Sequence, residues 1–228
     1  MARVRVKICG VQDPATAETA AAAGADAVGL VFAESRRRVT VAQATAIARA
    51  LPPFVAAVGV FVDAPLEEVL ALAHGVPLDA VQLHGEESPE EVEALRAQGL
   101  RVIKAVRVGA EDTAAVVRAA VERYARASAI LLDTRVEGLA GGSGRPFPWV
   151  VGEGLSVRVP VIVSGGLRAE TVPEALTRLR PYGVDVSSGV EREGRKDPEA
   201  IRAFVAAVRA WECGQRAPDG GHAWTECP

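Results

Sequence analysis

The stretch VRVKICGVQDPATAETAAAAG, residues 4–24, holds the pattern that decides the fold. Apolar and polar residues alternate over 3–9, which predicts a β-strand with two different faces. Asp13 followed by Pro14 is a helix start signal, and Gly24 stands where such a helix would end. The stretch therefore predicts one strand followed by one helix.

The same unit recurs along the 228 residues of the chain. Short runs rich in Val, Ile and Leu predict eight strands, at 3–9, 26–32, 54–61, 78–83, 100–105, 128–133, 159–163 and 183–187. Stretches with helical spacing follow seven of them, at 14–23, 40–51, 65–73, 89–98, 112–125, 168–179 and 198–211. The sixth strand is followed only by a short helical candidate, 146–152. A strand that returns parallel to its neighbour needs a crossover of about a dozen or more residues, which these units supply.

Eight such units predict an α/β fold, a single (β/α)8 TIM barrel occupying residues 1–211. The alternative is an open, doubly wound parallel sheet with at least six strands. No long linker divides the chain. Residues 212–228, ECGQRAPDGGHAWTECP, are expected to form a flexible C-terminal tail.

Composition excludes several classes of protein. The net charge is −3 and aromatic residues make up 4%, so no basic surface for nucleic acid is expected. The longest apolar run, 54–62, is far shorter than the roughly 20 residues that a membrane-spanning helix needs. No signal peptide is visible, and three cysteines are too few for a disulfide framework or a zinc site. A cytoplasmic globular protein is expected.

Strand parity sorts the polar residues onto the inner face of the barrel. In the first strand the apolar residues face the helices, so Lys7 points inward, and Cys9 lies at the carboxyl end. Active sites of such barrels lie at this end. By the same reasoning, further polar side chains are expected there, namely Gln82, His84, Lys104, Asp133, Asp185 and Ser187.

Three glycine-rich turns follow the sixth, seventh and eighth strands, and they are predicted to bind phosphate. They are GGSG at 141–144, SGGL at 164–167 and SSGVE at 187–191. Glycine lets backbone N–H groups approach an anion closely, and barrels often bind phosphate after strands seven and eight. The candidates are Gly142, Gly165, Gly166, Ser187, Ser188 and Gly189. The alternative is that these are simply tight turns.

A basic run, SRRR at 35–38, follows the second strand at the same rim. An arginine there would hold a carboxylate through two parallel hydrogen bonds. The alternative for the run is a solvated basic loop.

Taken in order along residues 3–208, these motifs resemble the phosphoribosylanthranilate isomerase family of tryptophan biosynthesis. The resemblance rests on KICG (7–10), DAVGLVF (26–32) with SRR (35–37), VGVFV (58–62), DAVQLHGEE (79–87), VIKAV (102–106), LLDT (131–134), GGSG (141–144) with FPW (147–149), SGGL (164–167) and VDVSSGVE (184–191) with GRKD (194–197). It implies an Amadori rearrangement of N-(5-phosphoribosyl)anthranilate to 1-(2-carboxyphenylamino)-1-deoxyribulose 5-phosphate, an aldose–ketose isomerisation that needs no cofactor and no metal.

The resemblance also implies roles for individual residues. Asp133 would be the general acid that protonates the furanose ring oxygen, and Cys9 the general base that removes the proton from C2. Arg37 would contact the anthranilate carboxylate, but FAESRRR departs from the family in lacking a proline and having three adjacent arginines, so Arg36 is an equal candidate. Gln82, His84 and Asp185 are further candidates for contacts with the substrate. Structural hydrogen bonding at the rim is the alternative for His84 and Asp185.

The chemistry requires a base and an acid whose pKa values are shifted in opposite directions. A thiol ordinarily titrates near 8.5, and the inward Lys7, with Lys104 as a second candidate, is predicted to lower the pKa of Cys9. An Asp ordinarily titrates near 3.9, so the acid must keep its proton through burial or through substrate binding. The sequence leaves that choice open.

Other functions are compatible with parts of the pattern. A histidine-pathway sugar isomerase would pair two aspartates at strand ends, whereas here the first strand ends in Cys9. A barrel that only binds a phosphorylated metabolite would not need both Cys9 and Asp133. A thiol hydrolase would need a histidine near Cys9, and His84 belongs to a strand three units away. The expected partner is a small phosphorylated substrate, without nucleic acid or membrane, bound by a monomer or a homodimer.

Overall fold

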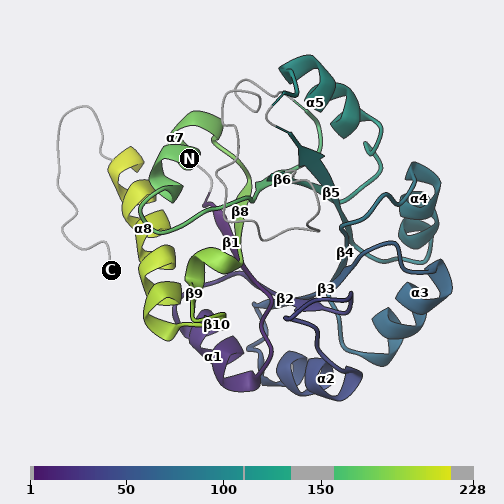
Figure 1. Cartoon of the computed structure of the whole chain (residues 1–228), viewed down its shortest axis with the longest axis horizontal. Helices are drawn as coiled ribbons and strands as arrows, with labels where there is room; N and C mark the ends of the chain where they lie inside the picture. Colours follow the sequence, from purple (N-terminus) through teal and green to yellow (C-terminus); the bar gives the residue numbers. More distant parts are fainter. Residues whose placement is uncertain (1–2, 110, 135–156, 217–228) are drawn as a thin grey trace.

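A computed structural model describes residues 3–109, 111–134 and 157–216. Eight strands form a closed, all-parallel barrel in the order β1 to β8, with β8 pairing with β1 (Figure 1). The strands are β1 (Arg5–Cys9), β2 (Ala27–Val31), β3 (Ala56–Phe61), β4 (Ala80–Leu83), β5 (Val102–Val108), β6 (Ala129–Thr134), β7 (Val161–Val163) and β8 (Gly183–Val186). The predicted barrel is confirmed, and the doubly wound alternative is wrong.

Helices surround this barrel (Figure 1). In the described ranges they are α1 (Pro14–Ala22), α2 (Val41–Ala50), α3 (Leu66–Gly75), α4 (Pro89–Ala97), α5 (Ala114–Glu122), α7 (Val172–Leu179) and α8 (Pro198–Arg216). The predicted helix 146–152 lies outside the described residues. A short 3-10 helix, η1 (Ser188–Val190), and a hairpin of β9 (Glu191–Arg192) and β10 (Arg195–Lys196) follow β8.

Helix starts follow from the capping residues that the sequence offers. The Asp13 side chain accepts a hydrogen bond from the backbone N–H of Thr16 at 2.8 Å, and Pro14 begins α1. Ser88 and Glu91 form a reciprocal capping box at the start of α4. These caps fix where the chain leaves the barrel rim, and therefore how long each rim loop is.

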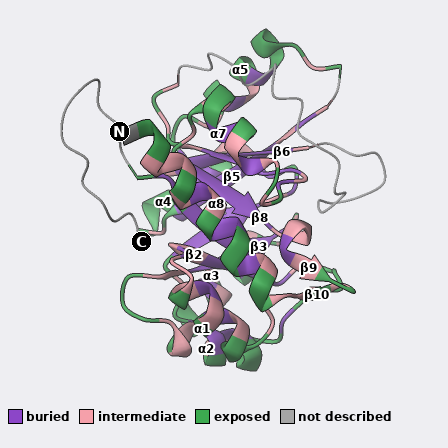
Figure 2. Cartoon of the chain, turned by 90° about the vertical axis from the view of Figure 1, so that its left-hand side faces the viewer, coloured by how far each residue is buried: buried purple, intermediate pink, exposed green. Residues whose placement is uncertain are grey.

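Two apolar layers hold the barrel together. The larger one packs strand residues such as Ile8, Val81 and Val106 against the helices. The smaller one fills the barrel interior with Val58, Ala80, Ile103, Ala105, Ala129, Leu131 and Ile162. Figure 2 shows the result, with buried strands at the centre and exposed surface on the outer helices. The interior layer is a packed core, so it supports the site above it rigidly.

The C-terminal helix continues beyond the boundary expected at residue 211. α8 runs to Arg216, so residues 212–216 extend a helix rather than begin a tail. Arg209 Nη1 donates to the carbonyl oxygen of Val4 at 2.9 Å, and the Glu212 carboxylate accepts from the backbone N–H of Val4. The helix is therefore fastened to the start of β1. None of the helices in the described part of the chain is long and apolar enough to cross a membrane.

Candidate active site

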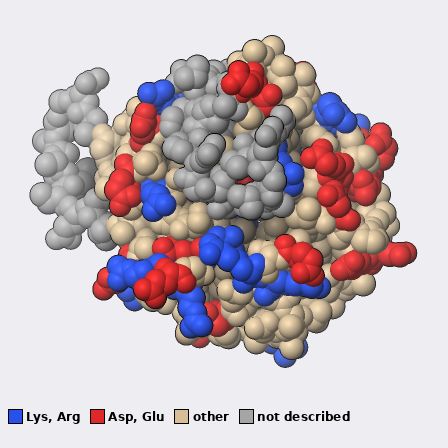
Figure 3. All heavy atoms as spheres, in the orientation of Figure 1, with Lys and Arg blue, Asp and Glu red and all other residues tan. Residues whose placement is uncertain are grey.

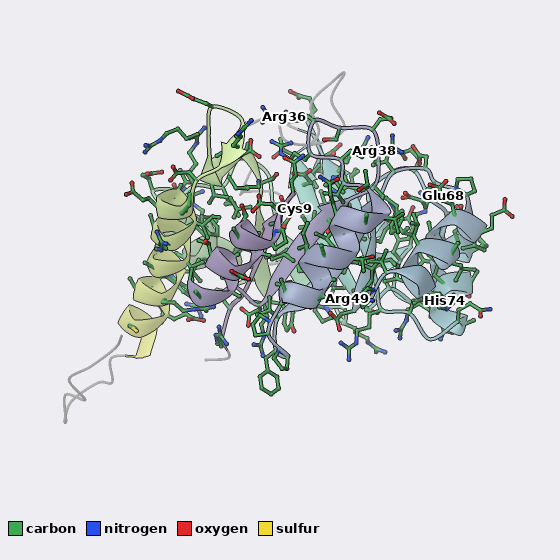
Figure 4. All side chains as sticks on the ribbon, turned by 90° about the horizontal axis from the view of Figure 1, so that it is seen from below. Cys9, Arg36, Arg38, Arg49, Glu68 and His74 are labelled. Carbon is green, nitrogen blue, oxygen red and sulfur yellow. The ribbon has the colours of Figure 1, made fainter. Side chains whose placement is uncertain are left out.

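A cavity of about 710 Å³ opens at the carboxyl ends of the barrel strands. Side chains from four different strand ends line it, namely Cys9, His84, Asp133 and Asp185. Both residues predicted to perform the chemistry thus face the same space. In Figure 4, Arg36 and Arg38 lie at one end of the barrel, Arg49 and His74 lie at the other, and Cys9 lies inside between them.

Cys9 is a free thiol at the end of β1 and is 9% exposed. Burial raises the pKa of Cys9, because it penalises the thiolate, and Asp185 raises it further. The charges of Lys7 and Lys196 oppose this and lower it. The predicted direction of the Lys7 effect is therefore right, but burial outweighs it, and the net pKa is raised.

Lys7 and Asp185 form a buried ion pair beside the thiol. Lys7 Nζ lies 2.8 Å from Asp185 Oδ1, and the two side chains are 5% and 4% exposed. Burial alone would lower the pKa of Lys7, but Asp185 and Cys9 raise it above the ordinary lysine value. Lys7 is therefore a fixed cation under Cys9. The other Asp185 oxygen, Oδ2, lies 3.5 Å from the hydroxyl of Ser164.

On the opposite side of the cavity, Asp133 is held by two contacts. Its Oδ1 accepts from the backbone N–H of Thr134 at 2.9 Å, and its Oδ2 lies 3.1 Å from His84 Nε2. His84 Nδ1 in turn lies 2.8 Å from Gln82 Nε2. Asp133 is 5% exposed, so few waters compete for these contacts. Gln82 is fully buried and does not line the cavity, so the structure places it behind His84, and its predicted contact with substrate stays a prediction.

Lys104 does not point into the barrel as predicted. Its neighbours on the same strand face, Val102 and Val106, belong to the helix-facing core. Lys104 Nζ lies 2.9 Å from Glu87 Oε2 and donates to the carbonyl oxygen of Gly85 at 2.7 Å. Glu87 also accepts from the backbone N–H groups of Gly85 and Asp63, each at 3.0 Å. This buried pair anchors the loop that follows His84 and is remote from the thiol.

The predicted phosphate turns after β7 and β8 meet at the cavity rim. Gly165, Gly166, Ser187, Ser188 and Gly189 all line the cavity. A Cβ atom at Gly189 would overlap the carbonyl oxygen of Leu167, so the turns touch and only glycine fits. The third predicted turn, with Gly142, lies outside the described residues.

The basic run after β2 folds against a carboxylate that the sequence did not single out. Arg37 Nε and Nη2 donate to the two Glu191 oxygens at 2.6 and 3.0 Å, a bidentate pair. Arg36 Nη2 donates to Glu191 Oε2 at 2.6 Å. Lys196 Nζ donates to Glu191 Oε1 at 2.9 Å and to the carbonyl oxygen of Ser187 at 2.8 Å. Figure 3 shows basic side chains gathered near β2 and the β9–β10 hairpin.

Glu191 and Lys196 thus contact Arg37 and Ser187, which line the cavity, and sequence reasoning did not single them out. Burial alone would raise the pKa of Glu191, but the hydrogen bond from Arg37 and the charge of Lys196 lower it. Burial lowers the pKa of Lys196, against the pull of Glu191. The available signal was their place in the motifs SSGVE and GRKD. Three cations around one carboxylate leave the rim positive and suited to an anionic ligand.

Nothing in the described ranges resembles a metal centre, since no group of three or more His, Cys, Asp or Glu side chains there is placed to hold an ion. The chemistry that the site offers is acid–base chemistry. It has a thiol beside a fixed cation, a carboxyl group hydrogen-bonded to an imidazole across the cavity, and anion-binding turns and arginines at the rim.

Comparisons with known proteins agree with this arrangement. The family model of N-(5'-phosphoribosyl)anthranilate (PRA) isomerase matches residues 6–207. The N-(5'-phosphoribosyl)anthranilate isomerase of Desulforamulus reducens is 50% identical over 206 residues, which is 90% of this chain and 95% of that protein.

Two solved structures are similar over the whole barrel. One is a phosphoribosyl anthranilate isomerase in complex with reduced 1-(o-carboxyphenylamino)-1-deoxyribulose 5-phosphate, with a TM-score of 0.79, 40% identity and coverage of 91% of this chain and 99% of that one. The other is a monomer generated from the dimeric isomerase of Thermotoga maritima, with a TM-score of 0.78, 37% identity and coverage of 91% and 99%. This chain belongs to the N-(5'-phosphoribosyl)anthranilate isomerase family.

Proposed function

We propose that this chain is a phosphoribosylanthranilate isomerase of tryptophan biosynthesis in which Cys9 is the general base and Asp133 the general acid. It converts N-(5-phosphoribosyl)anthranilate into 1-(2-carboxyphenylamino)-1-deoxyribulose 5-phosphate. The observation that carries the mechanism is the placement of Cys9 and Asp133 on the walls of one cavity beside anion-binding turns. The family membership carries the reaction.

The first step is ring opening. Asp133 gives a proton to the furanose ring oxygen, the C1–O bond breaks, its electron pair stays on that oxygen, and the anthranilate nitrogen becomes part of a Schiff base. Cys9 thiolate then takes the proton from C2, and the electron pair moves toward C1 and the nitrogen. The resulting enolamine rearranges to the ketone. Two groups on opposite sides of the sugar suit this sequence of transfers.

Burial raises the pKa of Cys9, so its thiolate is scarce but poorly solvated, and a poorly solvated thiolate is a strong base. The charge of the neighbouring Lys7 lowers the pKa of Cys9, which makes the thiolate easier to form. When the C2 proton arrives on sulfur, the charge that was paired with Lys7 is neutralised, and Asp185 continues to hold the lysine in place.

Substrate binding uses the rim. The phosphate group is bound by the turns of Gly165, Gly166, Ser187, Ser188 and Gly189. The anthranilate carboxylate is bound by Arg36 and Arg37, which line the cavity beside Glu191. His84 and Asp185 contact the sugar hydroxyls. No metal or cofactor takes part.

The chain is proposed to act in the cytoplasm without nucleic acid or membrane partners, as a monomer or a homodimer. The similar Thermotoga maritima protein is described as dimeric. Sedimentation equilibrium of the purified chain separates the two states.

The decisive experiment follows the fall of substrate fluorescence as the anthranilate adduct is consumed. Cys9→Ser and Asp133→Asn are each expected to lower kcat by about 10²–10⁴-fold, because each removes one proton-transfer group. Val116→Ala, which alters an exposed side chain on α5 away from the cavity, is the comparison variant. Absence of turnover by the wild-type chain would refute the function, and normal turnover by either catalytic variant would refute the mechanism.

A further inference from the structure

Gln82 occupies an unusual position for a polar residue. It is 0% exposed and lies inside the barrel behind His84, without reaching the cavity. Its Nε2 lies 2.8 Å from His84 Nδ1, while its Oε1 is buried with no hydrogen-bond partner in the described part of the chain. Buried polar atoms without a partner are uncommon because they lose hydration without compensation. The hydrogen bond that the described residues offer this amide is therefore the one to His84.

The contacts of His84 connect this amide to the general acid. A neutral imidazole carries one N–H, on either Nδ1 or Nε2. If Gln82 points its NH2 group at Nδ1, that nitrogen accepts, so the hydrogen is on Nε2 and donates to Asp133 across 3.1 Å. An acid that accepts this bond is an ionised carboxylate, which has no proton to give.

The reverse orientation of the amide gives the reverse outcome. If Gln82 Oε1 accepts from Nδ1–H, Nε2 carries a lone pair and accepts from a protonated Asp133. The backbone N–H of Thr134 already occupies Asp133 Oδ1 at 2.9 Å, so the proton is on Oδ2, the oxygen that faces His84. The two amide orientations therefore match the ionised and the protonated state of the acid.

We propose that Gln82 is a positioning residue whose amide orientation sets whether the His84–Asp133 pair holds the proton delivered to the substrate. This inference deepens the proposed function and rests on it. In the protonated state the Asp133 O–H bond breaks, the proton moves to the ring oxygen, and Asp133 becomes a carboxylate. The single hydrogen of the imidazole then moves from Nδ1 to Nε2 by exchange with water in the cavity that His84 lines, the amide turns its NH2 group to the bare Nδ1, and the Nε2–H group stabilises that carboxylate.

Charged groups face the pair from several elements, and they form a fixed background. Arg107 of β5 donates from Nη2 to the carbonyl oxygen of His84 at 2.8 Å. Asp185, Arg36 and Arg37 line the same cavity as the pair, together with the titratable thiol of Cys9, and Lys7 is ion-paired with Asp185. Gln82 differs from all of them. It is neutral, and its side chain both donates and accepts, so it changes the proton count of the pair without adding a charge.

Two substitutions at one position separate the two orientations. Gln82→Glu places an acceptor against Nδ1 and holds the protonated state. Gln82→Met keeps the length of the side chain but accepts only weakly, so His84 is free to carry its hydrogen on Nε2 and face an Asp133 carboxylate. Ile103→Met alters the interior residue paired in register with Gln82 and serves as the packing control.

The first readout is the ¹⁵N NMR spectrum of imidazole-labelled protein. The chain has three histidines, so a His84→Gln sample identifies the His84 signals. At pH 7 we expect His84 Nδ1 to be protonated in Gln82→Glu and Nε2 to be protonated with Nδ1 bare in Gln82→Met. The same tautomer in both variants would overturn the proposal.

The second readout is steady-state kinetics. We expect Gln82→Met to lower kcat about 10- to 100-fold with KM changed less than threefold, a part of the effect ascribed to a general acid. Gln82→Glu should recover at least tenfold over Gln82→Met, and Ile103→Met should remain within threefold of wild type. Wild-type kcat in Gln82→Met overturns the proposal, even if Gln82→Glu fails to fold. If Asp133→Asn also kept full activity, the proposed mechanism itself would fail, which distinguishes the two failures.

Discussion

The side chains of Lys7 and Asp185 form an ion pair with 2.8 Å between Nζ and Oδ1, directly below the thiol of Cys9. The two charges act on the thiol in opposite directions, since Lys7 lowers the pKa of Cys9 and Asp185 raises it. Strand register places them together, because Lys7 of β1 is paired with Asp185 of β8. The proton affinity of the proposed base, Cys9, is therefore adjusted by a residue of a neighbouring strand as well as by one of its own strand.

We expect substitutions of Lys7 and of Asp185 to shift the pKa of the Cys9 thiol in opposite directions. Lys7→Met should move thiolate formation by Cys9 to higher pH, and Asp185→Asn should move it to lower pH. Thiolate absorbance near 240 nm, with Cys9→Ser as the blank, measures both, and thermal unfolding checks that each variant folds. Shifts of the same sign in the two variants would contradict the assignment of causes.

We expect Glu191 to make the free energy of unfolding depend on pH. Its pKa is lower in the folded chain than in the unfolded one, so the folded state releases its proton more readily. The stabilisation is present above the unfolded pKa and is lost as pH falls through the folded pKa. Glu191→Gln should therefore cost about 1.5–3 kcal/mol of unfolding free energy at pH 7, the range for hydrogen bonds to charged groups.

Urea unfolding at pH 7 and at pH 3 measures this effect. The difference between wild type and Glu191→Gln should shrink at the lower pH, because the wild-type carboxylate is then being protonated. Comparing the two proteins at each pH cancels the titration of the other carboxylates. A difference that grows on acidification would show that Glu191 is not the responsible group.

We expect substitutions at Lys104 and Glu87, which form a buried ion pair, to have strongly non-additive effects on stability. Their side chains are 2% and 3% exposed, so replacing either alone leaves a buried charge. Lys104→Met or Glu87→Leu alone should cost about 3–5 kcal/mol, whereas the double variant should lose less than the sum of the two. Chemical denaturation of all four proteins gives the coupling energy. Strict additivity would show that the pair does not act as a unit.

Gly10 is expected to be needed for the placement of Arg37. It has φ +79°, and a Cβ there would overlap the Arg37 side chain. Gly99 has φ +83° with nothing within 4 Å of such a Cβ, so Gly99→Ala carries only the backbone strain. Each substitution should cost roughly 1–2 kcal/mol for the left-handed conformation.

Only Gly10→Ala should also raise KM, because it displaces Arg37, the arginine proposed to bind the substrate carboxylate. Measurements of the unfolding free energy and of steady-state kinetics for the two variants separate the effect of backbone strain from the effect of displacing Arg37. An equal KM in both would show that Arg37 tolerates the methyl group or does not bind the substrate.

Strand and helix positions were predictable because burial imposes a repeating pattern. Most bounds agree within about two residues. Among the larger differences are the end of α8, expected at 211 and found at Arg216, the start of α7, expected at 168 and found at Val172, and the end of β5, expected at 105 and found at Val108. The continuation of β5 through Val106 and Val108 packs against the helices and was available in the alternation. The polar side chains of Cys9, Asp133 and Asp185 were placed correctly for the same reason.

Lys104 was assigned to the wrong face because β5 is apolar on both sides. VIKAVRV has apolar residues at consecutive positions, so alternation alone did not decide which face meets the helices. Its partner Glu87 follows a different strand, and only the folded chain brings the two together.

Glu191 and Lys196 could not be found from periodicity. They lie in strands of two residues each, which are too short to show a pattern. The hydrogen bond between Arg37 and Glu191 joins residues 154 positions apart. Side-chain direction in such a hairpin depends on tight turns rather than on a repeating face.

The pairing of β1 with β8 also has a consequence for how the protein folds during its synthesis. The contact of Lys7 with Asp185 spans 178 residues, so a chain emerging from the ribosome contains Cys9, the proposed general base, almost from the start and completes the surroundings of that thiol almost last. Contacts of such long range are slow to form because the intervening chain must first be ordered. We therefore expect activity to appear only once the last strand has closed the barrel, and a chain that ends before β8 to be inactive.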